Sequence, residues 1–137
     1  MRLWLMFNME ITQPLAVKKV WGREEIIVNN EKYCGKILVL NRGYRCSIHR
    51  HPKDETFYVQ SGEVYLELEN NQGSMESAIL LPTSVVHISP SRWHRFSGLE
   101  NSVIFEFSTQ DTESERSASS EAIPDFENWI KKINRDI

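Results

Sequence analysis

Short runs of alternating apolar and polar residues fill the chain between about residues 24 and 108. The run EVYLELE shows this pattern most clearly, because Val64, Leu66 and Leu68 share one face of an extended strand. The neighbouring runs are closed by turn signals, which include Asn29-Asn30, Asn41-Arg42-Gly43, Pro52 and Ser61-Gly62. About eight strands at regular spacing, without helical periodicity between them, predict an all-β antiparallel sandwich or barrel for residues 20–108.

The character of the chain changes after Ser108. The segment STQDTESERSASSEA is polar and rich in serine, so we interpret it as a loop or flexible linker. Pro124 then opens a segment in which apolar residues recur at helical spacing, namely Phe126, Trp129, Ile130, Ile133 and Ile137. Residues 109–137 therefore predict a polar linker and a short amphipathic helix, which either caps the barrel or docks on a partner subunit.

Length, composition and charge narrow the class of protein. A chain of 137 residues suits one domain, and its 16 basic and 19 acidic residues, without a long basic run, argue against nucleic acid as a partner. The apolar run LWLMF is shorter than the roughly 7–15 residues of a secretory core or the roughly 20 of a membrane-spanning helix. We therefore expect a cytoplasmic protein without membrane association, in which Cys34 and Cys46 are reduced thiols.

The apolar N-terminal segment has no evident place inside a barrel of this size. Residues 1–19 carry the sequence RLWLMF, and the edge strands of a small barrel invite pairing with another chain. We expect a homodimer in which this segment packs on the neighbouring subunit or adds a strand to it. The expected organisation is thus an N-terminal segment (1–19), a barrel (20–108), and a C-terminal linker with a helix (109–137).

Two histidines and a glutamate lie close together in the stretch SIHRHPKDE. In a strand, residues i and i+2 share a face with Cα atoms roughly 6.5–7 Å apart, so His49 and His51 can reach one ion. Glu55 begins the next strand after a tight reversal and can face the same point. His94, in ISPSRWHRF, is expected to provide a fourth ligand from a different strand. Imidazole and carboxylate ligands suit one divalent transition metal ion such as Zn, Mn, Fe, Ni or Co.

The spacing of these residues resembles the first motif of the cupin superfamily. The matching pattern is Gly43-x5-His49-x-His51-x3-Glu55-x6-Gly62, and SPSRWHRF, with Pro90 and His94, resembles the second motif. The second motif usually has a glycine where this chain has Ser91. The resemblance covers roughly residues 20–108. It implies a cupin-type jelly-roll β-barrel that holds one divalent ion with three histidines and a glutamate.

A longer stretch indicates the branch of the superfamily. The segment from VWGREEIIV to EVYLEL, with its YCGK step, is similar to small cupins related to mannose-6-phosphate isomerase of the bifunctional type. This resemblance implies metal-dependent aldose–ketose isomerisation of a sugar or sugar phosphate, which needs an ion to hold two sugar oxygens and a base to move a proton. Two alternatives stay open, namely a non-catalytic sugar-binding or regulatory cupin and a cupin dioxygenase.

Strand parity gives candidate substrate-binding residues. Arg45 and Ser47 share the parity of His49 and His51, so both are expected to line the same cavity. Arg45 could grip a phosphate or carboxylate with its planar guanidinium, or it could lie at the rim in water. Lys53 is a candidate catalytic residue that could donate to a sugar oxygen, with a solvated turn lysine as the alternative.

The candidates for the general base are less well defined. Glu106 is the natural extra carboxylate, yet its parity opposes that of Phe105 and Phe107. If these aromatic residues fill the core, Glu106 points outward. His87 and Tyr58 are out of phase with the inward-facing residues of their strands, which favours surface positions for both. The sequence therefore identifies no unambiguous base.

Overall fold

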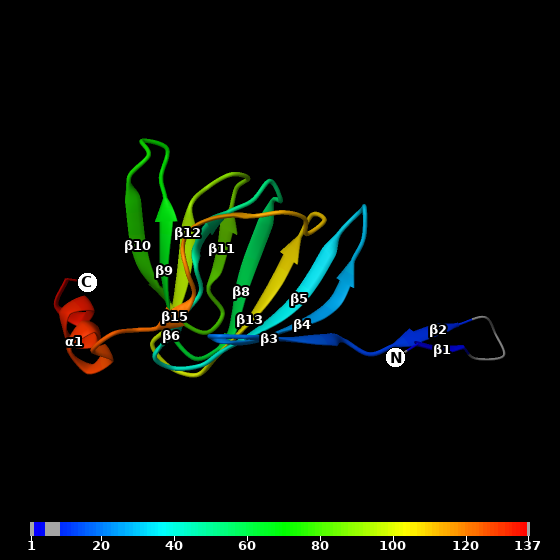
Figure 1. Ribbon diagram of the computed structural model, residues 1–137, viewed down its shortest axis with the longest axis horizontal. Helices are drawn as coiled ribbons and strands as arrows, with labels where there is room; N and C mark the ends of the chain where they lie inside the picture. The colour runs from blue at the N-terminus through cyan, green and yellow to red at the C-terminus, as the bar shows by residue number, and fades with distance from the viewer. Residues whose placement is uncertain (1, 5–8, 137) are drawn as a thin grey trace.

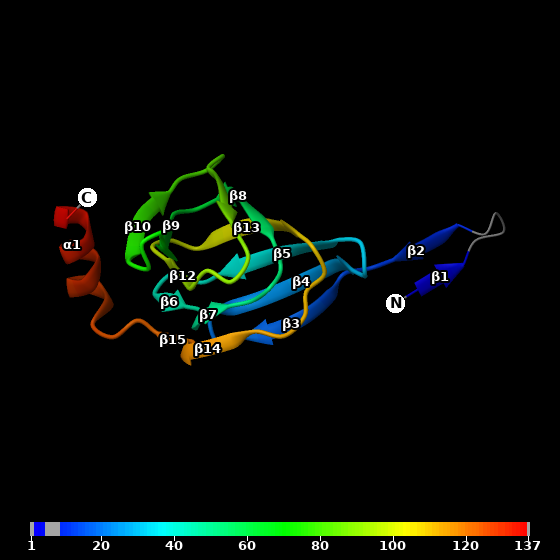
Figure 2. The same cartoon turned by 90° about the horizontal axis from the view of Figure 1, so that it is seen from above.

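The structure is a barrel of two facing antiparallel sheets, as the alternation of the sequence predicts. The computed structural model describes residues 2–4 and 9–136 of the chain. One sheet has six strands in the order β11-β8-β13-β5-β4-β3, and the other has seven, with β10-β9-β12-β6-β15 in sequence and β7 joining β12 to β14. Figure 1 and Figure 2 show the two sheets curving around a common interior.

The elements of the described residues have the following bounds: β1 Arg2–Trp4, β2 Glu10–Thr12, β3 Leu15–Lys19, β4 Gly22–Asn29, β5 Cys34–Leu40, β6 Tyr44–Arg45, β7 Ile48–Arg50, β8 Glu55–Ser61, β9 Val64–Glu69, β10 Met75–Leu80, β11 Val85–Ile88, β12 His94–Gly98, β13 Ser102–Ser108, β14 Glu115–Ala118, β15 Glu121–Ala122 and α1 Phe126–Asp136.

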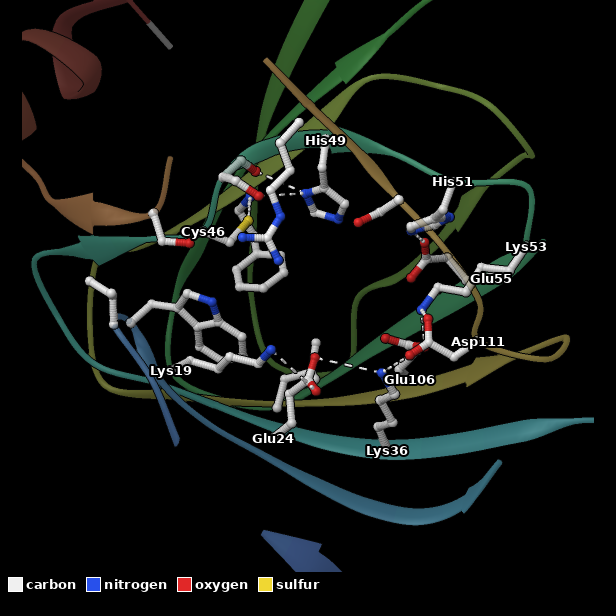
Figure 3. A pocket seen from close by; sticks show the side chains of 18 of the residues that line it. Lys19, Glu24, Lys36, Cys46, His49, His51, Lys53, Glu55, Glu106 and Asp111 are labelled. Carbon is white, nitrogen blue, oxygen red and sulfur yellow. Dashed lines mark hydrogen bonds and ion pairs between the residues drawn. The ribbon is translucent and has the colours of Figure 1, made fainter. Parts of the chain in front are cut away.

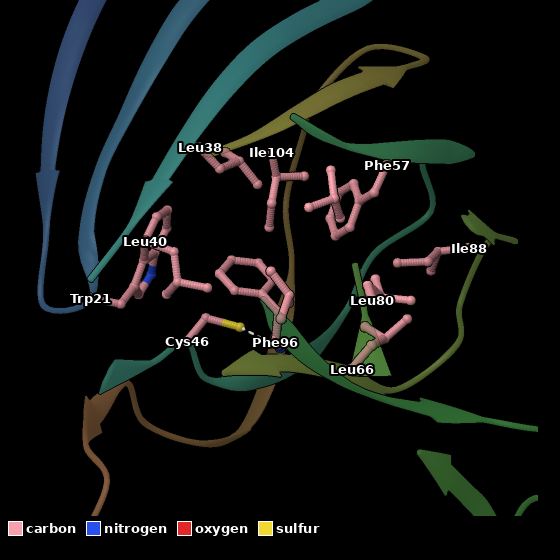
Figure 4. Packing of buried hydrophobic residues seen from close by; sticks show 12 residues of the cluster. Trp21, Leu38, Leu40, Cys46, Phe57, Leu66, Leu80, Ile88, Phe96 and Ile104 are labelled. Carbon is pink, nitrogen blue, oxygen red and sulfur yellow. Dashed lines mark hydrogen bonds between the residues drawn. The ribbon is translucent and has the colours of Figure 1, made fainter. Parts of the chain in front are cut away.

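The interior of the barrel is apolar over one part of its length and charged over the rest. The apolar part is a cluster that includes Trp21, Leu38, Leu40, Phe57, Phe96 and Ile104 (Figure 4). The inward faces of three neighbouring strands then change character together. Lys36 on β5, Glu55 on β8 and Glu106 on β13 are each almost completely buried, and Glu106 pairs in register with Lys36. The same alternation that builds the core therefore continues into a polar compartment.

The segment after Ser108 is not a loose linker, and that part of the sequence prediction is wrong. Strand β14 pairs with β7, and β15 pairs with β6, so residues 109–122, here called the strap, extend the seven-stranded sheet. The Arg50 guanidinium donates to Glu115 over 2.9 Å, and the backbone amide of Ile123 donates to the Gly43 carbonyl over 2.8 Å. Backbone pairing with an edge holds this polar segment, and serine-rich composition does not reveal such pairing.

The predicted amphipathic helix is confirmed as α1, which follows the strap. Its Trp129 ring lies 5.5 Å from the ring of Tyr65 on β9, and Ile133 is buried. The guanidinium of Arg42 lies over the ring of Phe126, 4.6 Å from its centroid. The helix therefore packs on the outside of the barrel. Ile137, assigned to the same apolar face, lies outside the described residues.

The N-terminal region divides into two parts. Strands β1 and β2 pair as a hairpin that extends away from the barrel (Figure 1 and Figure 2), whereas β3 pairs with β4 at the edge of the six-stranded sheet. The sheet thus begins at Leu15, before the expected barrel boundary at residue 20. Residues 5–8, which belong to the apolar run, lie outside the described residues. The role of the N-terminal segment in a dimer stays a prediction.

Candidate functional site

A cavity of about 540 Å³ occupies the charged compartment of the barrel. Both sheets and the strap contribute to its lining (Figure 3). The cavity is of the size that small-molecule sites usually have, roughly 300–1,000 Å³. Part of the lining is apolar, from core residues such as Trp21, Leu38 and Phe96, and its charged or metal-binding side chains include a cluster of histidines with Glu55 and a row of alternating acids and lysines.

Three histidines converge in the cavity, as their spacing predicts. His94 on β12 lies opposite His49 on β7 in register, and His51 follows β7 directly. The ring centroids of His49 and His94 are 4.2 Å apart, and those of His51 and His94 are 5.0 Å apart. One ring nitrogen from each histidine lies within 4.8 Å of the others. The arrangement brings three imidazole ligands to a single point.

Hydrogen bonds to the backbone orient two of the rings. His49 Nδ1 lies 2.9 Å from the Ser47 carbonyl, and His94 Nδ1 lies 2.8 Å from the Arg92 carbonyl. A carbonyl oxygen only accepts, so each Nδ1 carries the proton and each Nε2 keeps a lone pair. Burial, as the largest cause, lowers the pKa of His49 to about 4 and that of His94 to about 3. Both imidazoles are therefore neutral at pH 7, which is the state that binds a metal.

Glu55 completes the donor set. Its Oε2 lies 2.6 Å from His51 Nε2 and 3.6 Å from His94 Nε2. All three atoms are buried, yet none has a partner with hydrogen-bond geometry among the described residues. Buried lone pairs without partners are costly, and a shared cation would satisfy all of them at once. The residues fit a divalent metal ion, and they include all four of the predicted ligands.

The row of charged side chains begins at Lys53. Its ammonium donates to Glu106 Oε2 over 2.8 Å and to Asp111 Oδ1 over 3.0 Å, and the residue is only 6% exposed. The alternative of a solvated turn lysine is therefore wrong. Burial alone would lower the pKa of Lys53, but the charges of Glu106 and Glu55 outweigh it and raise that pKa well above its usual value. Lys53 is a permanent cation and a hydrogen-bond donor.

Glu106 points into the cavity, and the expectation that it faces outward is wrong. It is 4% exposed, whereas Phe107 is 59% exposed and Phe105 stacks on Tyr58 with ring centroids 5.9 Å apart. The aromatic residues of β13 cover the outer face of the six-stranded sheet, so the charged residue takes the inner one. Ser108 also donates to Glu106 Oε2, over 3.1 Å.

Sequence reasoning missed three charged residues of this row, namely Glu24, Lys36 and Asp111. Lys36 donates to Asp111 Oδ2 over 2.6 Å and pairs with Glu24 over 3.6 Å. Lys36 shares the parity of Leu38 and Leu40 in the run GKILVL, and this signal could have identified it. Asp111 lies in a polar stretch of the strap, where no pattern distinguishes it from its neighbours.

Of the two predicted substrate-binding residues, only Ser47 lines the cavity. Arg45 donates instead to Glu121 on β15, over 2.5 Å, and is not among the described lining residues. The strand is interrupted at Cys46 and Ser47, which lie between β6 and β7, so the alternation that connected Arg45 to His49 does not hold. The assignment of Arg45 to the cavity is wrong for this reason.

The remaining predictions concern surface residues and a turn. His87 is exposed and contacts Asp54 over 2.5 Å, as expected for a surface histidine. Ser91 replaces the glycine of the family motif and has a φ of 62°, the left-handed conformation that glycine adopts most easily. Its backbone amide donates to the His51 carbonyl over 2.8 Å. The second motif therefore keeps its turn without the glycine.

The double-sheet barrel with a histidine and glutamate cluster in its interior defines a cupin. Solved structures with this fold include oxalate decarboxylase of Bacillus subtilis (TM-score 0.64, 15% identity, 72% of this chain and 27% of that chain). Others are CapF of Staphylococcus aureus (0.63, 14%, 80% and 34%) and KdgF of Halomonas sp. (0.58, 20%, 66% and 80%). The predicted jelly-roll fold is confirmed. The chain spans only about a third or less of the first two proteins.

Curated relatives identify the family within the cupins. A D-lyxose ketol-isomerase of Thermofilum sp. is 33% identical over 75% of this chain and 72% of its own length. A D-lyxose/D-mannose isomerase of Thermosediminibacter oceani is 34% identical over 66% of this chain and 64% of its own. No family model matches. The chain belongs to the D-lyxose ketol-isomerase family of cupin sugar isomerases, and the narrower likeness to mannose-6-phosphate isomerase stays a prediction.

Within residues 2–4 and 9–136, no helical segment has the length and apolarity that crossing a bilayer requires.

Proposed function

We propose that this protein is a metal-dependent aldose–ketose isomerase of a free pentose or hexose related to lyxose or mannose. The observation that carries the proposal is the pair formed by Glu106 and Lys53, buried in the same cavity as the three histidines and Glu55. The family relatives act on D-lyxose and D-mannose by name. The cavity of about 540 Å³ has room for a monosaccharide.

A free sugar is favoured over a sugar phosphate. The residue predicted to grip a phosphate, Arg45, is paired with Glu121 instead of lining the cavity. Three of the lysines that do line it, Lys19, Lys36 and Lys53, are each in an ion pair with a carboxylate. A neutral polyol can exchange hydrogen bonds with such pairs without adding net charge to the cavity. Lys18 and Arg116 also line the cavity, so sugar phosphates are tested beside the free sugars.

The metal site would consist of His49, His51, His94 and Glu55. A divalent ion bound there would supply Lewis-acid polarisation of sugar oxygens and leave positions open for two of them. The cupin oxalate decarboxylase is described with Mn(II) centres, which makes manganese one of the ions to test.

Glu106 is the proposed general base. Its Oε2 accepts from Lys53 and Ser108, whereas Oε1 accepts no hydrogen bond from the described residues. This free oxygen can take the proton from C2 of the aldose. The electron pair of the broken C–H bond forms the C1=C2 bond, and the C1=O π pair moves to O1, which takes up a proton to give the enediol. Glu106 then returns its proton to C1 while the C2–O2 carbonyl forms and O2 releases its hydroxyl proton, which balances the proton taken up at O1, and the ketose results. Lys53 has a third N–H to donate to the oxygen that gains negative charge.

The position of Glu106 also bears on the two alternatives. A non-catalytic sugar-binding cupin was supported by the lack of a base in the sequence analysis, and an inward Glu106 removes that support. A dioxygenase would use the same metal ligands, whereas the isomerase proposal also accounts for the buried Lys53–Glu106 pair beside them. No feature of the described residues favours a dioxygenase.

The test is proton exchange in deuterated water. The protein is dialysed against EDTA, reloaded with Mn, Co, Ni, Zn or Fe(II) in turn, and incubated with lyxose, mannose, other pentoses and hexoses, and the sugar phosphates while NMR follows deuterium incorporation. Isomerisation is expected with at least one ion and not after EDTA alone. Glu106→Gln is expected to lower kcat by about 10²–10⁴-fold, the usual contribution of a general base, with metal content unchanged.

A matched control is Glu115→Gln, which removes an exposed carboxylate of the strap that pairs with Arg50. Its activity should equal that of the wild type. The proposal fails if no sugar of the panel exchanges protons with any ion, or if Glu106→Gln isomerises at the wild-type rate.

A further inference from the structure

Asp111 is fixed in space by the backbone and by a distant strand. Its amide donates to Asn29 Oδ1 over 2.9 Å, and Asn29 Nδ2 donates back to the Asp111 carbonyl over 3.3 Å. Asn29 is the last residue of β4, so this reciprocal pair ties the first part of the strap to the six-stranded sheet. The strap is thereby attached at the point where its acidic side chain enters the cavity lining.

The two carboxylate oxygens of Asp111 hold two different lysines. Oδ1 accepts from Lys53 over 3.0 Å, and Oδ2 accepts from Lys36 over 2.6 Å. Both lysine side chains are almost fully buried, at 5% and 3% exposure. Hydrogen bonds from Lys36 and Lys53, together with their charges, outweigh burial and lower the pKa of Asp111 below its usual value. Asp111 therefore bridges two buried cations as a permanent anion.

The bridge determines where Lys53 points. Its ammonium is held between Glu106 Oε2 and Asp111 Oδ1, and two fixed acceptors set the direction of its remaining N–H. Without Asp111, Lys53 would keep one acceptor and could rotate. Lys36 would keep only Glu24, at 3.6 Å, and could move toward Glu106, its partner in register. Two cations would then compete for the proposed base.

We propose that Asp111 is a positioning residue for isomerisation, which aligns Lys53 on Glu106 and keeps Lys36 away from that carboxylate. The inference rests on the proposed function, because it presupposes that Glu106 and Lys53 act on the sugar. The strap would then contribute to catalysis by orienting Lys53 and Glu106, although Asp111 lies outside the two motifs of the cupin pattern.

Two other roles for Asp111 give different kinetic signatures. If Asp111 bound sugar hydroxyl groups itself, its loss would raise KM. If it only fastened the strap, its loss would lower the melting temperature and leave the kinetics of the folded protein unchanged. A positioning role instead lowers kcat with little change in KM, because the alignment matters in the transition state.

The experiment is steady-state kinetics of the metal-loaded full chain with the sugar that the exchange assay identifies. Asp111→Asn keeps the size of the side chain and one accepting oxygen but removes the charge and the second acceptor. The kcat is expected to fall about 10–100-fold, as for other residues that orient a catalytic group, with KM within about twofold and metal content unchanged. Glu115→Gln in the same strap is the control and should match the wild type.

A double variant tests whether Asp111 acts through Lys53. Since both changes disrupt the same arrangement, Lys53→Met combined with Asp111→Asn should be no more than about twofold slower than Lys53→Met alone. Fully multiplicative effects would overturn the proposal, as would an unchanged kcat in Asp111→Asn or a rise in KM alone. If Asp111→Asn does not fold, Asn29→Ala decides: a lower kcat at unchanged KM supports the proposal, and an unchanged kcat overturns it.

The controls separate this inference from the proposed function. If Glu106→Gln is inactive and Asp111→Asn has wild-type kinetics, only the role of Asp111 is refuted. If Glu106→Gln is fully active, the assignment of the base is wrong and the role of Asp111 fails with it.

Discussion

Acidification is expected to destabilise the metal-free protein through His49 and His94. Burial is the largest cause that lowers their pKa values, to about 4 for His49 and about 3 for His94. In the unfolded chain both imidazoles return to an ordinary pKa near 6.5. Below that pH the unfolded state binds more protons than the folded state. The stability that these groups contribute is therefore complete above pH 6.5 and is lost as the pH falls toward their folded pKa values.

The size of the effect follows from proton linkage. One proton taken up only on unfolding lowers the free energy of unfolding by about 1.4 kcal/mol per pH unit. Between about pH 6.5 and pH 5 both histidines are mostly protonated in the unfolded chain and neutral in the folded protein. Over this range each histidine lowers the free energy of unfolding by about 2 kcal/mol, and the pair lowers it by about 4 kcal/mol. A typical domain has roughly 5–15 kcal/mol of stability in total, so the loss is large enough to measure with confidence.

The assay is urea unfolding in EDTA at several pH values between 7 and 5. His94→Gln removes one of the two titrating groups, so its free energy of unfolding should fall about 1.4 kcal/mol less per pH unit than that of the wild type. The reasoning is refuted if the wild type and His94→Gln lose stability in parallel as the pH falls.

Two further predictions concern residues outside the cavity. Arg45→Gln should keep kcat/KM within about twofold, because Arg45 faces Glu121, and should lose about 1–2 kcal/mol of stability with that bond; a tenfold rise in KM would mean that Arg45 reaches the substrate. The full chain should elute as a dimer of 16.0 kDa subunits in size-exclusion light scattering, and deletion of residues 1–13 should give a monomer. A full-length monomer would contradict the proposed role of the N-terminal hairpin.

The convergence of the proposed metal ligands could be predicted from the sequence because their geometry is local. His49 and His51 share a face through the period of a strand, and Glu55 follows after a short reversal, so few residues determine their relative positions. His94 needed the second motif as well. The same local reasoning identified the helix at residues 126–136, whose apolar spacing is independent of its surroundings.

Predictions that depended on which face of a strand is buried were less successful. On β13 the aromatic residues Phe105 and Phe107 were expected to face the core. The interior beside this part of the strand is charged, however, and Glu106 is the residue that faces it. Arg45 was misplaced because the strand breaks before Ser47, and a sequence does not show such a break. Asp111 forms its bonds with residues 58 and 75 positions away, Lys53 and Lys36, and long-range pairs of this kind leave no periodic signal.

The order of the parts along the chain has a consequence for biosynthesis. Every proposed metal ligand precedes residue 95, whereas the strap that supplies Asp111 follows the last barrel strand. A nascent or nicked polypeptide that ends near Ser108 would hold the complete donor set for the ion and lack the residue that orders Lys53. Loss of the strap by cleavage after Ser108 would thus slow turnover without removing any of the proposed ligands of the ion.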